Sequence, residues 1–161
     1  MIIYHGSTDI VESPRIIYSV KGRDFGSGFY TTEIKEQANK WAKRLSRIRK
    51  KENAFLNIYE FDIDSAYREV TVKSFDNYSM EWLDMVVACR QDSEFRHEFD
   101  IVTGKIADDD VGETVQAVID GLAPKEFALS KLIYMSANSQ ICFCTEKALS
   151  FVRYLRTERV E

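Results

Sequence analysis

The chain has 161 residues and a mass of 18.7 kDa, which fits one domain of ordinary size. Hydrophobic residues make up 45% and aromatic residues 12%, a composition that supplies a sizeable core and excludes a disordered chain. The net charge of −4 at pH 7 argues against a protein that binds nucleic acid mainly by electrostatic attraction.

The first thirty residues predict two short strands separated by a loop. Ile2-Ile3-Tyr4 is apolar and β-prone and ends at Gly6-Ser7, so we expect a buried strand there. Residues 9–24 show no periodicity and include a proline, which indicates a loop with one strand turn at most. A second strand is expected at 29–32, directly after the tight turn Gly26-Ser27-Gly28.

A basic amphipathic helix is expected next, over about residues 33–51. Thr32 is its expected N-cap, and Glu33 and Glu36 stand where the helix dipole favours anions. Eight Lys/Arg against two Glu give this stretch +6; because residues 1–32 balance at zero, residues 52–161 hold −10. A solvated face is the simpler interpretation, and a patch for an acidic partner or a nucleic acid is the alternative. The expected apolar face consists of Ile34, Ala38, Trp41, Ala42, Leu45 and Ile48.

The remainder of the chain intermixes strands and helices. Ser79 and Thr145 are the expected N-caps of the first and the last of these helices. The order lacks regular βαβ alternation and no Pro/Gly/Ser-rich linker interrupts it, which predicts one α+β domain covering residues 1–161. We expect strands at 54–63, 69–72, 100–102 and 141–144, and helices at 79–90, 110–120, 125–134 and 146–151.

Two polar or glycine-rich patterns invite a functional interpretation and have a simpler one. Gly26-Ser27-Gly28 lacks the third glycine of a dinucleotide-binding loop, Thr31 standing in its place, so a tight chain reversal is favoured. Asp108-Asp109-Asp110 resembles a metal-binding cluster. It also directly precedes a predicted helix. Carboxylates can cap the free N–H groups at the start of a helix, and we favour this capping role.

The cysteines predict neither a metal site nor a catalytic thiol. Cys142 and Cys144 are spaced too closely for a usual zinc pair or an easy mutual disulfide, and adding Cys89 and His97 does not correct the spacing. In a strand the two would face the same side and pack as small apolar residues. The odd cysteine count, the lack of a signal peptide and the lack of a long apolar run predict a cytoplasmic protein without membrane association.

Three residues are more informative as a set than singly. His5 follows the first apolar strand, Tyr30 lies two residues beyond a Gly-x-Gly turn, and Gln140 begins the strand at 141–144. Each alone has a structural interpretation: a satisfied histidine, a tyrosine at the core edge, a glutamine at a strand start. Together they place an imidazole, an aromatic plate and an amide at the ends of three apolar strands.

These residues belong to segments that resemble a bacterial family of unknown function. That family is in turn similar to the ADP-ribosyltransferase superfamily, in its His-Tyr-Glu branch of diphtheria-toxin and poly-ADP-ribose polymerase type. The resemblance implies a split antiparallel β-sheet core with flanking helices and a cleft that binds NAD without a metal. The segments are Tyr4-His5-Gly6-Ser7, residues 24–32, Gln37-Ala38-x-x-Trp41-Ala42, residues 100–102 and 106–110, Ser139-Gln140-Ile141-Cys142-Phe143 and Ala148-Leu149.

The resemblance also implies roles for individual residues. His5 would hydrogen-bond an adenosine-ribose hydroxyl, the Gly6 backbone would bind the nicotinamide carboxamide, and Tyr30 would stack on the nicotinamide ring. Ser7 and Thr31 would be neighbours of the bound NAD. Holding the leaving group still in this way would contribute mainly orientation to the reaction.

The resemblance places Gln140 where the third motif of the superfamily has Glu, whose charge favours the cationic transition state. Glutamine keeps a hydrogen bond to the ribose 2′-hydroxyl but brings no charge, and restoring Glu is expected to raise NAD hydrolysis. The first hypothesis is NAD-dependent ADP-ribosyl transfer to an unidentified intracellular protein, nucleic acid or small molecule, by a toxin of a toxin–antitoxin or phage-defence locus with an antitoxin partner. The second is a catalytically silent module that binds NAD or ADP-ribose and acts through a partner. An RNA 2′-phosphotransferase would need more His and Arg residues, and a nuclease would need an acid–base pair.

Overall fold

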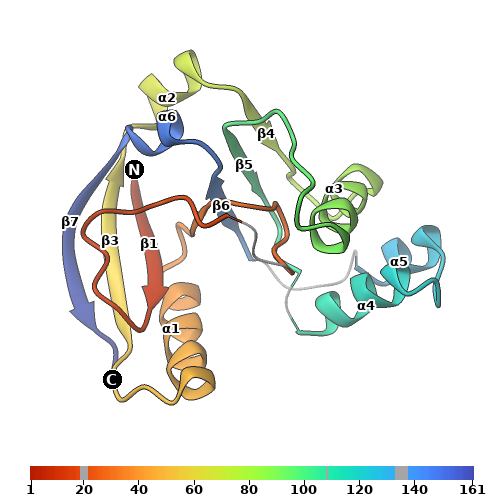
Figure 1. Cartoon of the computed structure of the whole chain (residues 1–161), viewed down its shortest axis with the longest axis horizontal. Helices are drawn as coiled ribbons and strands as arrows, with labels where there is room; N and C mark the ends of the chain where they lie inside the picture. The colour runs from red at the N-terminus through yellow and green to blue at the C-terminus, as the bar shows by residue number, and fades with distance from the viewer. Residues whose placement is uncertain (19–21, 108, 133–137) are drawn as a thin grey trace.

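Two β-sheets packed face to face form the centre of the fold (Figure 1). The computed structural model describes residues 1–18, 22–107, 109–132 and 138–161. The first sheet has the order β1-β3-β7 and is antiparallel throughout, with β1 at Ile2–Ser7, β3 at Phe55–Phe61 and β7 at Val152–Arg159. The second has the order β2-β6-β5-β4, with β2 at Phe29–Thr31, β6 at Gln140–Phe143, β5 at Ile101–Gly104 and β4 at Val72–Ser74.

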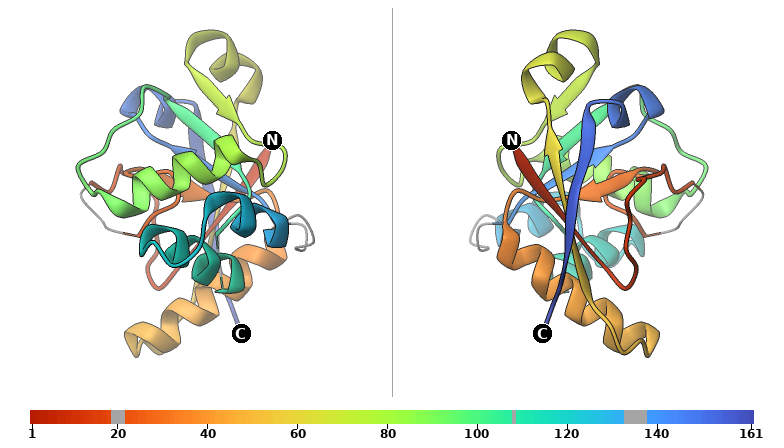
Figure 2. Two further views of the ribbon diagram at one scale, coloured as in Figure 1. Left: turned by 90° about the vertical axis from the view of Figure 1, so that its right-hand side faces the viewer. Right: turned by 90° about the vertical axis from the view of Figure 1, so that its left-hand side faces the viewer.

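Helices cover the outer face of each sheet. α1 packs on β1 and β3 of the first sheet, whereas α3, α4 and α5 pack on one another beside the second sheet (Figure 2, left). None of the helices in the described residues is long and apolar enough to cross a membrane. The helices are α1 (Lys35–Arg49), α2 (Ile63–Glu69), α3 (Met80–Gln91), α4 (Asp109–Ile119), α5 (Lys125–Leu132) and α6 (Glu146–Leu149).

Two apolar cores follow from the alternation of side chains along the strands. Ile141 and Phe143 of β6 face the first sheet, where the Phe143 ring meets Phe61 edge-on at 5.0 Å between centroids. Cys142 faces the opposite way, into the core that contains Trp82 of α3. All four residues of β6 are buried, because both faces of this strand are covered.

The α+β architecture is as predicted, and most elements lie where the sequence places them. The strand expected at 69–72 is displaced to Val72–Ser74, because Glu69 still belongs to α2. The expectation of an antiparallel core is wrong at one edge, because β4 runs parallel to β5. Two elements were not expected. The segment after β3 forms α2, capped by the Asp62 carboxylate, which accepts from the Ser65 N–H at 3.2 Å. The C-terminal residues form β7, whose pairing with β3 spans about a hundred residues of sequence.

The N-caps of two helices are confirmed, and that of α1 is corrected. Ser79 and Thr145 accept hydrogen bonds at 3.1 and 3.2 Å in the first turns of α3 and α6. Ile34 occupies the N-cap position of α1 without a side-chain cap, and the Thr32 hydroxyl accepts from the Ile34 N–H at 3.0 Å. α4 begins at Asp109, and Asp108, which would cap it, lies outside the described residues.

The expected apolar face of α1 is only partly buried. Ala38 and Ala42 are buried, but Trp41 is 49% exposed and Ile48 is 64% exposed. The cause is the close approach of the helix to β1: a Cβ on Gly6 would overlap the backbone of Ala38. A contact this close is formed by alanines, so the larger side chains extend beyond its rim.

Candidate functional site

Strands β1 and β2 of the two sheets touch at one point and then separate. The Tyr4 N–H donates to the Thr32 carbonyl at 2.8 Å, and the Thr32 N–H donates to the Tyr4 carbonyl at 2.9 Å. Continuing this antiparallel register would place Gly6 opposite Tyr30. His5 takes that pairing instead, because its Nδ1 hydrogen-bonds the Tyr30 carbonyl at 2.7 Å. The imidazole thus ends the ladder between the sheets after a single bridge.

The contacts of His5 define its protonation. Since a carbonyl accepts, Nδ1 carries the proton, which leaves Nε2 as an acceptor. Burial lowers the pKa of His5 despite the hydrogen bond to Tyr30, so the ring is neutral near pH 7. The ring lies 4.6 Å from that of Phe29 at an interplanar angle of 33°. Because β1 extends to Ser7, His5 sits within the strand and not beyond its end as the sequence suggested.

Gly6 and Ser7 complete β1 in different ways. Backbone groups alternate in direction along a strand, so Gly6, two residues after Tyr4, turns its N–H and C=O toward the β2 side, past the bridge with Thr32. A peptide donor and acceptor therefore face the point where the strands separate. The Ser7 hydroxyl accepts from the Asp9 N–H at 3.1 Å, which shapes the following turn.

The hydroxyl of Tyr30 is held by two backbone groups. Its hydroxyl donates to the Gly26 carbonyl at 2.7 Å and accepts from the Phe25 N–H at 3.0 Å, so the glycine turn fixes the ring. Burial raises the pKa of Tyr30 well above its ordinary value, which keeps the hydroxyl protonated. The guanidinium carbon of Arg23 lies 5.2 Å from the ring centroid, a cation–π contact on the ring face.

Thr31 and Gln140 tie the second sheet together. The Thr31 hydroxyl donates to the Ile141 carbonyl at 3.3 Å and is buried between β2 and β6. Gln140, also buried, donates through Nε2 to Asp24 Oδ2 at 2.8 Å and to the Lys105 carbonyl at 3.1 Å. Its amide nitrogen is therefore bound to protein groups.

Asp24 is a first residue of the site that could not be singled out from the sequence. Its buried carboxylate accepts from Arg90 Nε and Nη2 on one oxygen, at 2.8 and 2.6 Å, and from the Ala107 N–H and Gln140 on the other, both at 2.8 Å. Four donor atoms from three residues, Arg90, Ala107 and Gln140, meet on one carboxylate. The available signal was an acidic residue inside the segment 24–32; its partners are 66 to 116 residues away in sequence.

Asn57 is a second residue that sequence reasoning missed. It lies opposite His5 in the β1–β3 pairing and is fully buried. Its side chain accepts from the Val11 N–H at 3.0 Å and from the Thr157 hydroxyl at 2.7 Å, and donates to the Asp9 carbonyl at 3.0 Å. The signal was an amide between the apolar residues Leu56 and Ile58 of β3. It fixes the chain that follows Ser7.

The structure thus brings His5, Gly6 and Tyr30 together at the β1–β2 junction. Gln140 joins them indirectly, since Asp24, its partner, lies close enough to affect the Tyr30 pKa. Within the described part of the chain, no group of three or more His, Cys, Asp and Glu residues is arranged to hold a metal ion.

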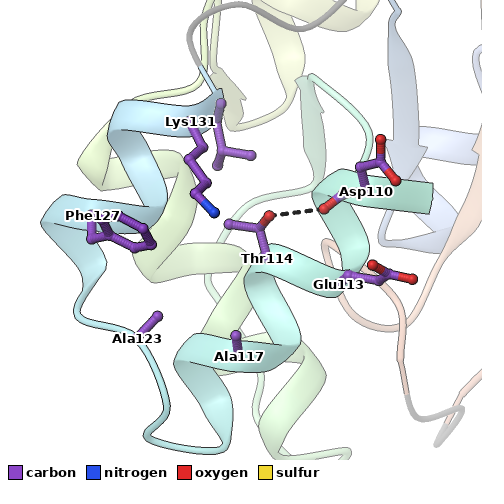
Figure 3. Close-up of a pocket in the computed structure, with 8 residues that line it drawn as sticks. Asp110, Glu113, Thr114, Ala117, Ala123, Phe127 and Lys131 are labelled. Atoms are coloured by element: carbon purple, nitrogen blue, oxygen red, sulfur yellow. Dashed lines mark hydrogen bonds between the residues drawn. The ribbon is translucent and has the colours of Figure 1, made fainter.

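A pocket of about 440 Å³ opens elsewhere, between α4 and α5 (Figure 3). Phe127 and Lys131 of α5 point toward α4, and Lys131 Nζ lies 4.7 Å from the Phe127 ring centroid. The Thr114 hydroxyl donates to the Asp110 carbonyl at 2.8 Å within α4. Neither His5 nor Tyr30 lines this pocket. The lining residues are Asp110, Glu113, Thr114, Ala117, Ala123, Phe127, Lys131 and Leu132.

Comparison with known proteins identifies a family. Residues 1–154 match the model of a family described as a protein of unknown function (DUF3990), and the chain belongs to that family. Neither the curated proteins nor the solved structures contain a match to the chain.

Proposed function

We propose that this protein binds NAD at the β1–β2 junction and transfers its ADP-ribosyl group to an acceptor, releasing nicotinamide. The observation that carries the proposal is the separation of the two strands around His5, which leaves the N–H and C=O of Gly6 facing the junction. A primary carboxamide offers one acceptor and two donors, so it can pair with both the N–H and the C=O of one residue. Nicotinamide carries such a carboxamide.

The Tyr30 ring supports stacking of the nicotinamide ring. Its hydroxyl is bound to the glycine turn at both donor and acceptor, so the plate is rigid before any ligand arrives. Arg23 lies over that ring and must move before an aromatic ligand can stack there. A cation–π contact of this kind is worth about 1 kcal/mol, less than the 1–3 kcal/mol of a base stacked on an aromatic side chain. Ligand stacking can therefore displace Arg23.

His5 supports recognition of a ribose hydroxyl. The neutral ring directs its proton to the Tyr30 carbonyl, so Nε2 is an acceptor. A hydroxyl group can donate to such a nitrogen. Protonation of His5 would remove this acceptor, so NAD binding should weaken as the pH falls below the lowered pKa.

The transfer breaks the bond between the nicotinamide nitrogen and the ribose. Nicotinamide leaves with the bonding electrons as a neutral molecule, and positive charge develops on the ribose until an acceptor nucleophile adds and loses its proton. Orientation of the leaving group by Gly6 and Tyr30 is the main contribution that this site can make. Gln140 adds no charge to stabilise the cation.

A silent NAD-binding module is the second candidate, and one observation favours it. The Gln140 amide donates to Asp24 and to the Lys105 carbonyl, so its Nε2 serves the fold. An enzyme of this type would gain more from a carboxylate aimed at the ribose. Both candidates bind NAD, and they differ in whether nicotinamide is released.

The experiment is to measure NAD binding and nicotinamide release by the purified chain, alone and with bacterial lysate. Tyr30→Leu removes the plate, and Tyr30→Phe is the matched control because it removes only the hydroxyl anchor. We expect the Leu variant to lose about tenfold or more in affinity and the Phe variant to lose less. Release that needs Tyr30 supports the transferase, and binding without release supports the silent module. A folded protein that neither binds NAD nor releases nicotinamide refutes the proposal.

A further inference from the structure

Two thiols and an imidazole meet on the helix-facing side of the second sheet. Cys142 Sγ and Cys144 Sγ lie 3.4 Å apart, and Cys144 Sγ lies 3.8 Å from His97 Nε2. The expectation that both cysteines face the same side is confirmed. The sequence suggested packing alone, but here the sulfur atoms are in contact with each other and with a ring nitrogen.

The neighbours of His97 define which nitrogen faces the sulfur. The Phe99 N–H donates to His97 Nδ1 at 3.2 Å, so Nδ1 is the acceptor and Nε2 carries the proton. Nε2 donates to the Phe25 carbonyl at 2.9 Å, and the same N–H group also faces Cys144 Sγ. Cys144 thus has an N–H group beside it, an arrangement that favours a thiolate over a thiol.

The three cysteines differ in their readiness to react. The hydrogen bond from Cys142 and then that from His97 lower the pKa of Cys144 to about 6, against the effect of burial. Burial raises the pKa of Cys142 well above its usual range and that of Cys89 to about 12. Cys144 is also partly exposed, whereas Cys142 and Cys89 are buried. Solvent-borne reagents therefore meet Cys144 first.

We propose that Cys144 and Cys142 form a peroxide-reactive thiol pair, in which Cys144 is the attacking sulfur and Cys142 the resolving one. The Cys144 thiolate attacks one oxygen of a hydroperoxide, the O–O bond breaks, and Cys144 becomes a sulfenic acid as hydroxide or alkoxide leaves. The Cys142 thiol then gives up its proton and attacks the Cys144 sulfur, forming the disulfide and releasing water. Two thiols lose two electrons to the peroxide, and the balance closes.

Closure of the pair requires Cys144 to move, because two cysteines at this spacing along a strand do not easily form a disulfide in place. A disulfide bond is about 2.05 Å long, so the sulfurs must approach by about 1.4 Å from their separation of 3.4 Å. Cys144 lies one residue beyond the end of β6, where its N–H donates to the Asp100 carbonyl at 2.7 Å, so it can move while the β5–β6 pairing up to Phe143 is kept. Cys142 is paired with Tyr30 within the sheet and stays in place.

The test is peroxide oxidation of the whole purified chain followed by mass analysis of tryptic peptides. Peptide 132–147 contains both members of the pair, and peptide 74–90 contains Cys89. With a few equivalents of hydrogen peroxide at pH 7, we expect peptide 132–147 to lose two hydrogens and to resist iodoacetamide until a dithiol reductant is added. Peptide 74–90 should keep an alkylatable thiol.

Variants separate the two roles. Cys144→Ser should slow the loss of alkylatable thiol from peptide 132–147 at least tenfold. Cys142→Ser should leave a sulfenic acid on Cys144 that dimedone traps. Cys142→Ala replaces the latter if the serine variant does not fold, and Cys89→Ser is the matched control, which should oxidise like the unchanged protein. The proposal is overturned if the unchanged protein fails to lose the two hydrogens, or if Cys144→Ser oxidises at an unchanged rate.

Discussion

Replacing Gln140 by glutamate tests the buried network directly. In the structure Gln140 Nε2 lies 2.8 Å from Asp24 Oδ2, and Arg90 holds the other oxygen of that carboxylate. Gln140→Glu therefore brings a second carboxyl group against an ionised one. The sequence led us to expect that restoring Glu raises NAD hydrolysis. The structure changes this expectation, because repulsion from the Asp24 carboxylate favours the protonated, uncharged form of the new group.

The magnitude follows from two competing costs. Two negative charges 2.8 Å apart repel by about 6 kcal/mol at an effective dielectric constant of 20. Keeping a proton on the introduced carboxyl costs ~1.36 kcal/mol for each pH unit above its unperturbed pKa near 4.3, or about 3.7 kcal/mol at pH 7. Protonation is the cheaper outcome. The variant should thus lose about 1 kcal/mol of unfolding free energy at pH 5 and between about 3 and 4 kcal/mol at pH 7.

The sign of the pH dependence is set by the direction of the shift. Repulsion raises the pKa of the introduced carboxyl in the folded state, so the unfolded chain binds fewer protons above pH 4.3 and stability falls as pH rises. Urea unfolding of both proteins from pH 5 to pH 8 measures the difference. Gln37→Glu is the matched control, since both side-chain bonds of Gln37 described here go to the Ser139 backbone. A difference that is independent of pH, or smaller than that of the control, would refute the reasoning.

Three further predictions concern the same region. Asp24→Asn leaves Arg90 without its counter-charge and should reduce the unfolding free energy by about 3–5 kcal/mol, against about 1 kcal/mol or less for exposed pairs, measured by urea unfolding. Gly6→Ala forces the Ala38 backbone to shift and should cost about 3 kcal/mol, seen as a lower melting temperature; an unchanged melting temperature would contradict the close packing. The lowered pKa of His5 makes the protein lose stability as pH falls below about 6.5. In His5→Asn the amide can still donate to the Tyr30 carbonyl but does not titrate, so the unfolding free energy should decline less as the pH falls. An equal decline in both proteins would show that His5 is not its cause.

Local signals explain why most elements could be predicted. The caps Ser79 and Thr145 act within one helical turn, and the apolar runs of β1, β3 and β6 need both faces covered wherever they lie. β7 carried no such signal, since its sequence VRYLRTER has neither a regular alternation of polar and apolar residues nor a continuous apolar run, and the strand is defined by its pairing with β3. The exposure of Trp41 could not be predicted from the sequence either. Helical periodicity shows which residues share a face of the helix, but not how closely that face approaches a strand.

The site divides in the same way. The resemblance picked out His5, Gly6 and Tyr30, and these three do lie at one junction, but the reason is the interruption of a strand ladder, which no residue pattern encodes. Asp24 and Gln140 illustrate the other case. Their bond joins positions 116 residues apart, and it gives the glutamine a structural role that its position in a motif could not suggest. A glutamate there would meet Asp24, so retaining an amide is what the buried carboxylate requires, whichever ligand the junction binds.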